Sequence, residues 1–227
     1  DFSFDSKYHE ERPVQRGVIQ LKELFIINII GLVIQVLLNI FISPKAFAFW
    51  LISFGYTIVA GNDFFAKKWI RKKFFLYNFI NMFQMLFLQF YLYSLININF
   101  SFSDIILIVH FVFVMFNLGL LEFGRKLKTK SEETKGRDTY SSRLGIKKAS
   151  LIFSVIYIVV FLLFSYMFFK IQGNLIYYLI SLVFLNLITF STVLYASLKS
   201  KTSTKFLESA SVLFYIAMHL LLVLTKI

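Results

Sequence analysis

Seven long stretches without charged side chains constrain the fold of this chain more than any other feature. They cover residues 24–42, 46–61, 74–100, 105–121, 149–169, 171–198 and 209–225, and none contains Asp, Glu, Lys or Arg. About 20 apolar residues cross roughly 30 Å of hydrocarbon as a helix, and flanking Lys or Arg side chains can extend a shorter stretch. The pattern predicts an all-α integral membrane protein, a helical bundle of seven transmembrane helices.

Composition supports a membrane location. Hydrophobic residues make up 58% of the 227 residues and the mean hydropathy is +0.73, whereas soluble domains contain about 45–50% apolar residues. The start of the chain is acidic and polar, unlike a signal peptide. Cysteine is absent, which excludes disulfides and thiolate metal ligands.

The basic residues predict the orientation in the membrane. Of the 24 Lys and Arg residues, 21 lie before the first stretch, after the second, between the fourth and fifth, or between the sixth and seventh. The positive-inside rule places these segments and the N-terminus in the cytoplasm and the C-terminus outside. We expect the bacterial inner (plasma) membrane as the location. Topology and lipid contact, rather than nucleic acid, then explain the net charge of +12 and the basic run KKWIRKK at residues 67–73.

The acidic residues follow the basic ones, although the positive-inside rule does not require it. Eleven of the 12 Asp and Glu residues lie on the predicted cytoplasmic side, mainly in residues 1–23 and 124–145. A face that combines carboxylates with cations favours the binding of a polyanion through metal ions.

The first cluster contains Asp1 and Asp5, which are four residues apart. On a helix this spacing places two carboxylates on one side, where they can share a divalent cation. Mg²⁺ takes one or two protein carboxylates and fills its other positions with water and phosphate oxygens. The same spacing is also typical of a solvated helix end. The nearby cations, candidates for diphosphate binding, are Lys7, Arg12 and Arg16.

The second cluster follows the fourth stretch. Its candidate metal ligands are Glu122, Glu132 and Glu133, and its candidate diphosphate-binding residues are Arg125, Lys126 and Lys128. Arg binds phosphate oxygens bidentately and Lys acts as a compact charge. An ordinary cytoplasmic loop, rich in Lys and Arg for topology alone, is the alternative interpretation.

The segment DFSFDSKYHEERPVQRG, residues 1–17, resembles the first aspartate-rich motif of the UbiA family of membrane prenyltransferases, approximately NDxxDxxxD followed by RP, a basic residue and Gly. Asp1 and Asp5 match the first two aspartates, and His9 stands at the third. The continuation is matched by Arg12, Pro13, Arg16 and Gly17. The resemblance implies that residues 1–227 form a single UbiA-like transmembrane domain that lacks the first two of nine helices.

The family's second acidic motif follows its sixth helix, and the segment EFGRKLKTKSEETKGRDTYSSRLG occupies that place here. Glu132 stands at the last metal-binding aspartate, whereas Arg125 and Lys128 replace earlier ones. The tail of the motif is matched by Gly136, Thr139 and Gly145. A second metal would therefore depend on Glu132, with Glu122 or Glu133 as substitutes.

The resemblance implies transfer of a polyprenyl group from a polyprenyl diphosphate to an aromatic or otherwise lipophilic acceptor, with Mg²⁺ assisting departure of the diphosphate. The acceptor class, the donor length and the oligomeric state stay open. Two alternatives remain: a catalytically silent relative that binds isoprenoid or lipid, and a small-solute transporter. The absence of charged residues and Pro from the seven stretches disfavours transport.

A polar stripe follows one side of the third stretch: Asn78, Asn81, Gln84 and Gln89. Such amides can line a cavity or hydrogen-bond neighbouring helices inside a membrane. We expect the second role.

Overall fold

Alternating long helices and short connections account for the whole described chain. The computed structural model describes residues 2–8, 10–96, 103–133 and 139–225. These ranges contain helices and loops and no β-strand, which confirms the all-α prediction.

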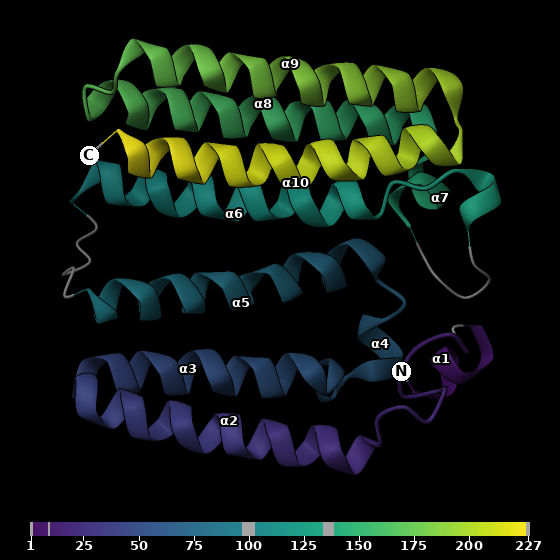
Figure 1. The fold of residues 1–227 in the computed structure, drawn as a ribbon, viewed down its shortest axis with the longest axis vertical. Coiled ribbons are helices and arrows are strands. Elements are labelled where there is room, and N and C mark those ends of the chain that lie inside the picture. Colours follow the sequence, from purple (N-terminus) through teal and green to yellow (C-terminus); the bar gives the residue numbers. More distant parts are fainter. Residues whose placement is uncertain (1, 9, 97–102, 134–138, 226–227) are drawn as a thin grey trace.

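Seven long helices lie side by side along one direction (Figure 1). Their bounds are α2 Leu21–Ile42, α3 Pro44–Gly61, α5 Phe74–Leu95, α6 Ile105–Arg125, α8 Ile146–Lys170, α9 Leu175–Leu198 and α10 Lys201–Leu224. The short elements are α1 Phe2–Tyr8, η1 Asp63–Phe65, α4 Lys67–Ile70, η2 Lys130–Glu132 and α7 Tyr140–Leu144. Each uncharged stretch of the sequence overlaps one long helix.

Helix boundaries follow capping chemistry rather than the ends of the uncharged stretches. The Ser43 side chain accepts from the Ala46 amide and Pro44 opens α3, while Asp104 accepts from the first amides of α6. Helix α10 begins at Lys201, where Ser200 caps it, rather than at residue 209. Charged residues end an uncharged stretch, but they do not end the helix, so a helix can continue beyond its apolar span.

Five helices are long and apolar enough to cross a membrane: α2, α6, α8, α9 and α10. The prediction of seven spans is therefore confirmed for these five only. Helix α3 is 18 residues long and begins with Pro44 and Lys45, and α5 carries amide and tyrosine side chains that lower its hydropathy.

The main core lies in a four-helix bundle of α6, α8, α9 and α10, and α5 connects this bundle to α3 and α2 (Figure 1). Phenylalanine dominates the core: Phe113, Phe153, Phe164 and Phe214 are fully buried. The apolar side chains of α2 are mostly exposed. Lipid would cover such a surface in a bilayer, so helix association there depends on close packing and polar contacts.

Polar side chains connect helices within the apolar layers. Gln84 of the stripe on α5 donates to Thr57 of α3 at 2.8 Å, and Asn78 bonds Lys126 at the end of α6. The buried Asn117 of α6 donates to the Tyr215 carbonyl of α10. For Asn78 and Gln84 the expected interhelical role is confirmed.

Helices α6 and α10 cross closely at Gly124. A Cβ atom built there would lie 2.6 Å from Ser211 Oγ and 3.3 Å from a ring carbon of Phe153. Small residues at a crossing let two helix backbones approach. The absence of a side chain at Gly124 therefore sets this helix spacing.

Substitution Gly124→Ala should destabilise the protein by about 1–3 kcal/mol, because the added methyl group overpacks the crossing. The control Gly31→Ala places its methyl on α2, where no atom lies within 4 Å, and should be neutral or stabilise by up to about 1 kcal/mol through helix propensity. Thermal unfolding in detergent measures both. Equal melting temperatures for the two variants would contradict the close crossing.

Candidate functional site

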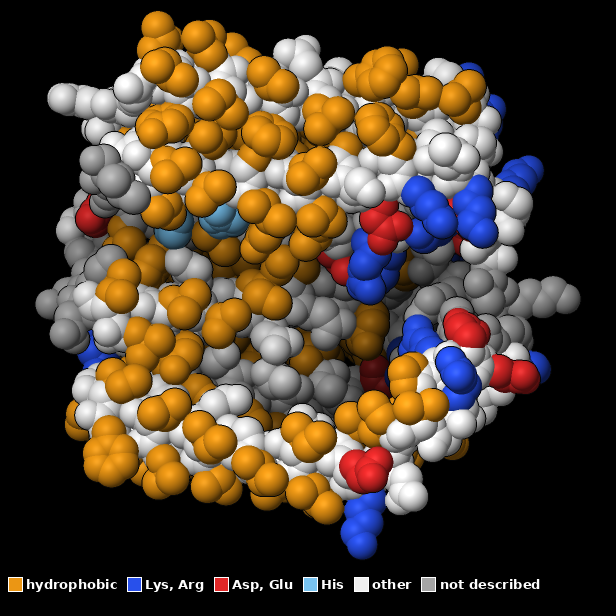
Figure 2. Space-filling view, viewed as in Figure 1, with side chains coloured by type: hydrophobic (Ala, Val, Ile, Leu, Met, Phe, Trp, Pro, Cys, Tyr) orange, Lys and Arg blue, Asp and Glu red, His pale blue; other side chains and the backbone are white. Residues whose placement is uncertain are grey.

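Charged side chains gather at one end of the helical bundle. Figure 2 shows Lys and Arg together with Asp and Glu over two areas of that end, with a recess between them. In Figure 1 the same end holds α1 on one side and the loop with α7 on the other. The two motif segments, more than 100 residues apart in the sequence, thus reach the same end of the molecule.

The first motif segment is held by an ion pair. Arg12 Nη1 lies 2.5 Å from Asp5 Oδ2, and the Asp5 side chain is only 15% exposed. The second carboxylate oxygen of Asp5 is buried and has no hydrogen-bond donor among the described residues. Gly17 ends the segment with a positive φ of 73° that favours glycine. Asp1 lies outside the described residues, so its pairing with Asp5 stays a prediction.

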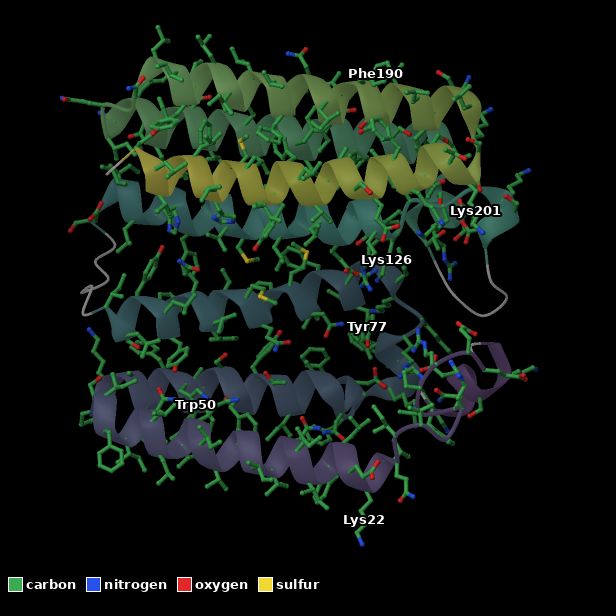
Figure 3. All side chains as sticks on the ribbon, in the orientation of Figure 1. Lys22, Trp50, Tyr77, Lys126, Phe190 and Lys201 are labelled. Atoms are coloured by element: carbon green, nitrogen blue, oxygen red, sulfur yellow. The ribbon has the colours of Figure 1, made fainter. Side chains whose placement is uncertain are left out.

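Glu122, Arg125 and Lys126 form the first part of the second cluster. Both oxygens of Glu122 are in use: one pairs with Arg125 Nη2 at 2.6 Å and the other with Lys126 Nζ at 2.7 Å. Lys126 also donates to Asn78 Oδ1 of α5 at 2.6 Å. Figure 3 shows Lys126 and Tyr77 at this junction of α6 with α5. This network ties the two helices together at the charged end.

Lys128 and Glu132 form the second part and have structural partners. Lys128 Nζ lies 3.2 Å from Glu208 of α10. Glu132 caps η2 by accepting from the amide and the hydroxyl of Thr129. Burial alone would raise the pKa of Glu132, but hydrogen bonds from Thr129 and Thr204 and the charge of Lys128 hold it below its ordinary value. Glu132 is therefore an ionised carboxylate with a role in loop geometry.

Glu133 differs from its neighbour. One of its oxygens accepts from the hydroxyls of Thr139, at 2.5 Å, and Ser141, at 3.1 Å. The other oxygen is buried and has no donor in the part of the chain that the structure describes. Such an oxygen is costly to bury and suits a cation.

The described residues offer single carboxylates for Mg²⁺ rather than a complete set of ligands. The described ranges contain no group of three or more His, Cys, Asp or Glu side chains placed to hold a metal ion. Mg²⁺ needs only one or two protein carboxylates when phosphate and water complete its shell. Asp5 and Glu133 each keep a buried carboxylate oxygen without a donor among the described residues. Both oxygens of Glu122 pair with Arg125 and Lys126, and Glu132 Oε2 accepts from Thr129. Metal binding by any of these four residues stays a prediction.

Sequence analysis missed a buried acid at the same end. Asp63 accepts from Arg71 Nε at 3.0 Å and from the Tyr77 hydroxyl at 3.1 Å. Asp63, Phe64 and Phe65 all have left-handed φ angles, between 53° and 56°, which cost about 1–2 kcal/mol per non-glycine residue. Asp63 lies just before the basic run at residues 67–73. The positive-inside rule explains the basic residues of this run but not the acid beside them, so Asp63 was the signal in the sequence.

Asp63→Asn should destabilise the protein by about 1–3 kcal/mol near pH 7, because it removes charge-assisted hydrogen bonds that support the strained turn. Burial raises the pKa of Asp63, but the bonds from Arg71 and Tyr77 and the charges of Arg71 and Lys67 lower it overall. A lowered folded-state pKa stabilises above the unfolded value of about 3.9 and loses that effect as the pH falls through the folded value.

Melting temperatures in detergent from pH 7 to pH 3 test this expectation. The wild type should approach the Asp63→Asn variant as the pH falls. Asp104→Asn serves as a control, because asparagine still caps α6 and the Asp63–Arg71 pair stays intact. A difference between wild type and Asp63→Asn that is constant with pH would contradict the ionised pair.

Comparison with known proteins identifies no relative: no family model, no curated protein and no solved structure matches this chain. The resemblance to the UbiA family therefore depends on the two motif segments. The function that it implies is a proposal.

Proposed function

We propose that this chain is a UbiA-type prenyltransferase domain that transfers a polyprenyl group from a polyprenyl diphosphate to a lipophilic acceptor. One observation carries the proposal. The two segments that resemble the family's motifs lie at one end of an apolar helical bundle, on two sides of a recess (Figures 1 and 2). A diphosphate in this recess could contact the cations of both segments while its isoprenoid chain extends among apolar helices.

The proposal includes seven membrane spans, with α3 and α5 crossing beside the five apolar helices. The polar groups of α3 and α5 bond to each other: Gln84 to Thr57, and the Tyr56 hydroxyl to the Ile80 carbonyl at 2.7 Å. Satisfied polar groups are what hydrocarbon requires. The charged end would face the cytoplasm, in a bacterial inner membrane, because it carries most of the Lys and Arg residues.

Single cysteines can test this topology, since the chain has none of its own. Cysteines at the exposed Ser6 and Ser131 should react with a membrane-impermeant maleimide in inside-out vesicles, and a cysteine at the exposed Gln172 should react in intact cells. Labelling of Ser6 and Ser131 positions from opposite sides would disprove a shared cytoplasmic site.

The chemistry divides between the metal and the side chains. Mg²⁺ bound at Asp5 or at Glu133 would neutralise the diphosphate leaving group. Arg12, Arg125 and Lys128 would donate to phosphate oxygens and so favour the charge that develops as the carbon–oxygen bond breaks. The diphosphate leaves with the bonding electron pair, and the acceptor bonds the allylic cation and gives up a proton.

Asp5→Asn should abolish Mg²⁺-dependent diphosphate release, and Glu133→Gln should reduce it by roughly 10- to 100-fold, an effect typical of a lost metal ligand or its support. Glu132→Gln should change turnover less, because its oxygens cap a loop. Lys128→Ala should mainly raise the KM for the donor. The assay uses radiolabelled polyprenyl diphosphates, detergent-solubilised protein and a membrane extract as the acceptor source. Wild-type turnover in Asp5→Asn would reject the metal role of the opening segment.

A catalytically silent, isoprenoid-binding relative is the second candidate. The observation that favours it is local pairing: Asp5 with Arg12, and Glu122 with Arg125 and Lys126, use charges that catalysis would need. A silent relative would bind the labelled donor without releasing diphosphate. A transporter would instead accumulate a small solute in proteoliposomes.

A further inference from the structure

A pocket rich in lysine opens at the charged end of the four-helix bundle. It encloses about 1090 Å³, and five lysines line it: Lys128, Lys130, Lys147, Lys148 and Lys199. Four Ser and Thr hydroxyls contribute to the same wall. The lining comes from the loop after α6, from α7, from the first turn of α8 and from the α9–α10 turn, which Figure 1 shows at one end of the bundle. We call it the lysine pocket.

The positive charge of the lysine pocket is poorly compensated. Lys128 pairs with Glu208, and Glu133 is the acid in the lining. For Lys130, Lys147, Lys148 and Lys199, the described ranges provide no ion pair. Like charges that share one pocket repel, and an anion that enters it would relieve the repulsion.

Backbone groups add to this field. The 25-residue helix α8 starts at the pocket, and its N-cap, Gly145, provides no side-chain hydrogen bond to the first amides. Ile146, Lys147 and Lys148 carry those amides and line the pocket. Two lysines beside the positive end of a helix dipole are unfavourable unless an anion is near. Lys199 ends α9 at φ 49°, a conformation in which glycine is usual, and adds a further cation to the lining.

If α8 crosses a membrane, the lysine pocket lies at the depth of the lipid phosphate groups. After Lys148, helix α8 continues without a charged residue to Phe169, so the pocket lies where this helix would leave the hydrocarbon. Leu144 and Ile146 add apolar surface to its wall. Basic pockets between transmembrane helices on the cytoplasmic side bind the phosphate headgroups of acidic lipids.

We propose that the lysine pocket binds a phosphate-bearing anion, either the headgroup of an acidic phospholipid or a soluble phosphate ester. This inference does not depend on the proposed prenyltransferase function. Every lining residue belongs to residues 128–148 or is Lys199, so none comes from the opening motif or from α2 to α5. Lys128 and Glu133 are shared with the proposed donor site, and the test leaves both unchanged.

The test compares two triple variants of equal charge. The pocket variant is Lys147→Ser/Lys148→Ser/Lys199→Ser. The control variant is Lys22→Ser/Lys45→Ser/Lys170→Ser, which removes three exposed lysines that neither line the pocket nor belong to the basic run at residues 67–73. Each purified protein is titrated in neutral detergent with phosphatidylglycerol, with cardiolipin, with inorganic phosphate and with phosphatidylcholine as an uncharged reference. Thermal shift and native mass spectrometry measure binding.

The wild type and the control variant should bind a phosphate-bearing probe, and the pocket variant should bind it roughly 100-fold more weakly, since each lysine contributes about a factor of five. Retained lipid would identify a headgroup, whereas a shift with inorganic phosphate alone would identify a soluble ester. Equal binding by the two triple variants, or no binding by the wild type, would overturn the proposal. Loss of Mg²⁺-dependent diphosphate release together with anion binding would show that the lysine pocket is part of the donor site, and would overturn its assignment as a separate phosphate site.

Discussion

The requirement that polar groups find partners inside hydrocarbon organises this protein. A helix satisfies its backbone internally, so seven uncharged stretches become seven long helices. The side chains that cannot be satisfied there, Asp, Glu, Lys and Arg, are forced to the helix ends and loops. Both charge signs concentrate at one end of the bundle because the loops at that end carry most of the charged residues.

Charge pairing then decides which carboxylate oxygens at that end already have a donor. Arg125 and Lys126 occupy both oxygens of Glu122, and Lys126 reaches Asn78, so this part of the cluster joins α6 to α5. Asp63 is similarly committed to Arg71 and Tyr77, where it supports three left-handed residues. Asp5 and Glu133 differ because each keeps one buried oxygen without a donor among the described residues. These two oxygens are the ones to which the proposed function assigns a cation.

The lysines at this end of the bundle fall into two groups, one paired with carboxylates and one without ion pairs among the described residues. Glu122 and Glu208 balance Lys126 and Lys128, whereas the other lysines of the lysine pocket gather around the start of α8 without an ion pair among the described residues. In water with about 0.1 M salt, the field of this excess positive charge would extend roughly 10 Å before counterions screen it. In the proposed orientation this excess would face the acidic lipids of the cytoplasmic membrane surface.

The sequence by itself determined the all-α class, the order of the long helices and the collection of charge at alternate loops. These properties depend on local hydropathy and charge, which can be read along the chain. It also identified Asn78 and Gln84 as interhelical contacts, because amides in an apolar helix need partners.

Only the tertiary structure decided which charges pair, because pairing depends on residues distant in sequence. Lys128 meets Glu208 across 80 positions, and Asp63 meets Tyr77 through a left-handed turn that no propensity predicts. The motif predicts Glu132 as a metal ligand; in the structure Thr129 donates to that carboxylate, and Glu133 holds a buried oxygen without a donor among the described residues. Glu132 and Glu133 are adjacent and chemically alike, but the folded loop turns their side chains in different directions and so gives them different partners.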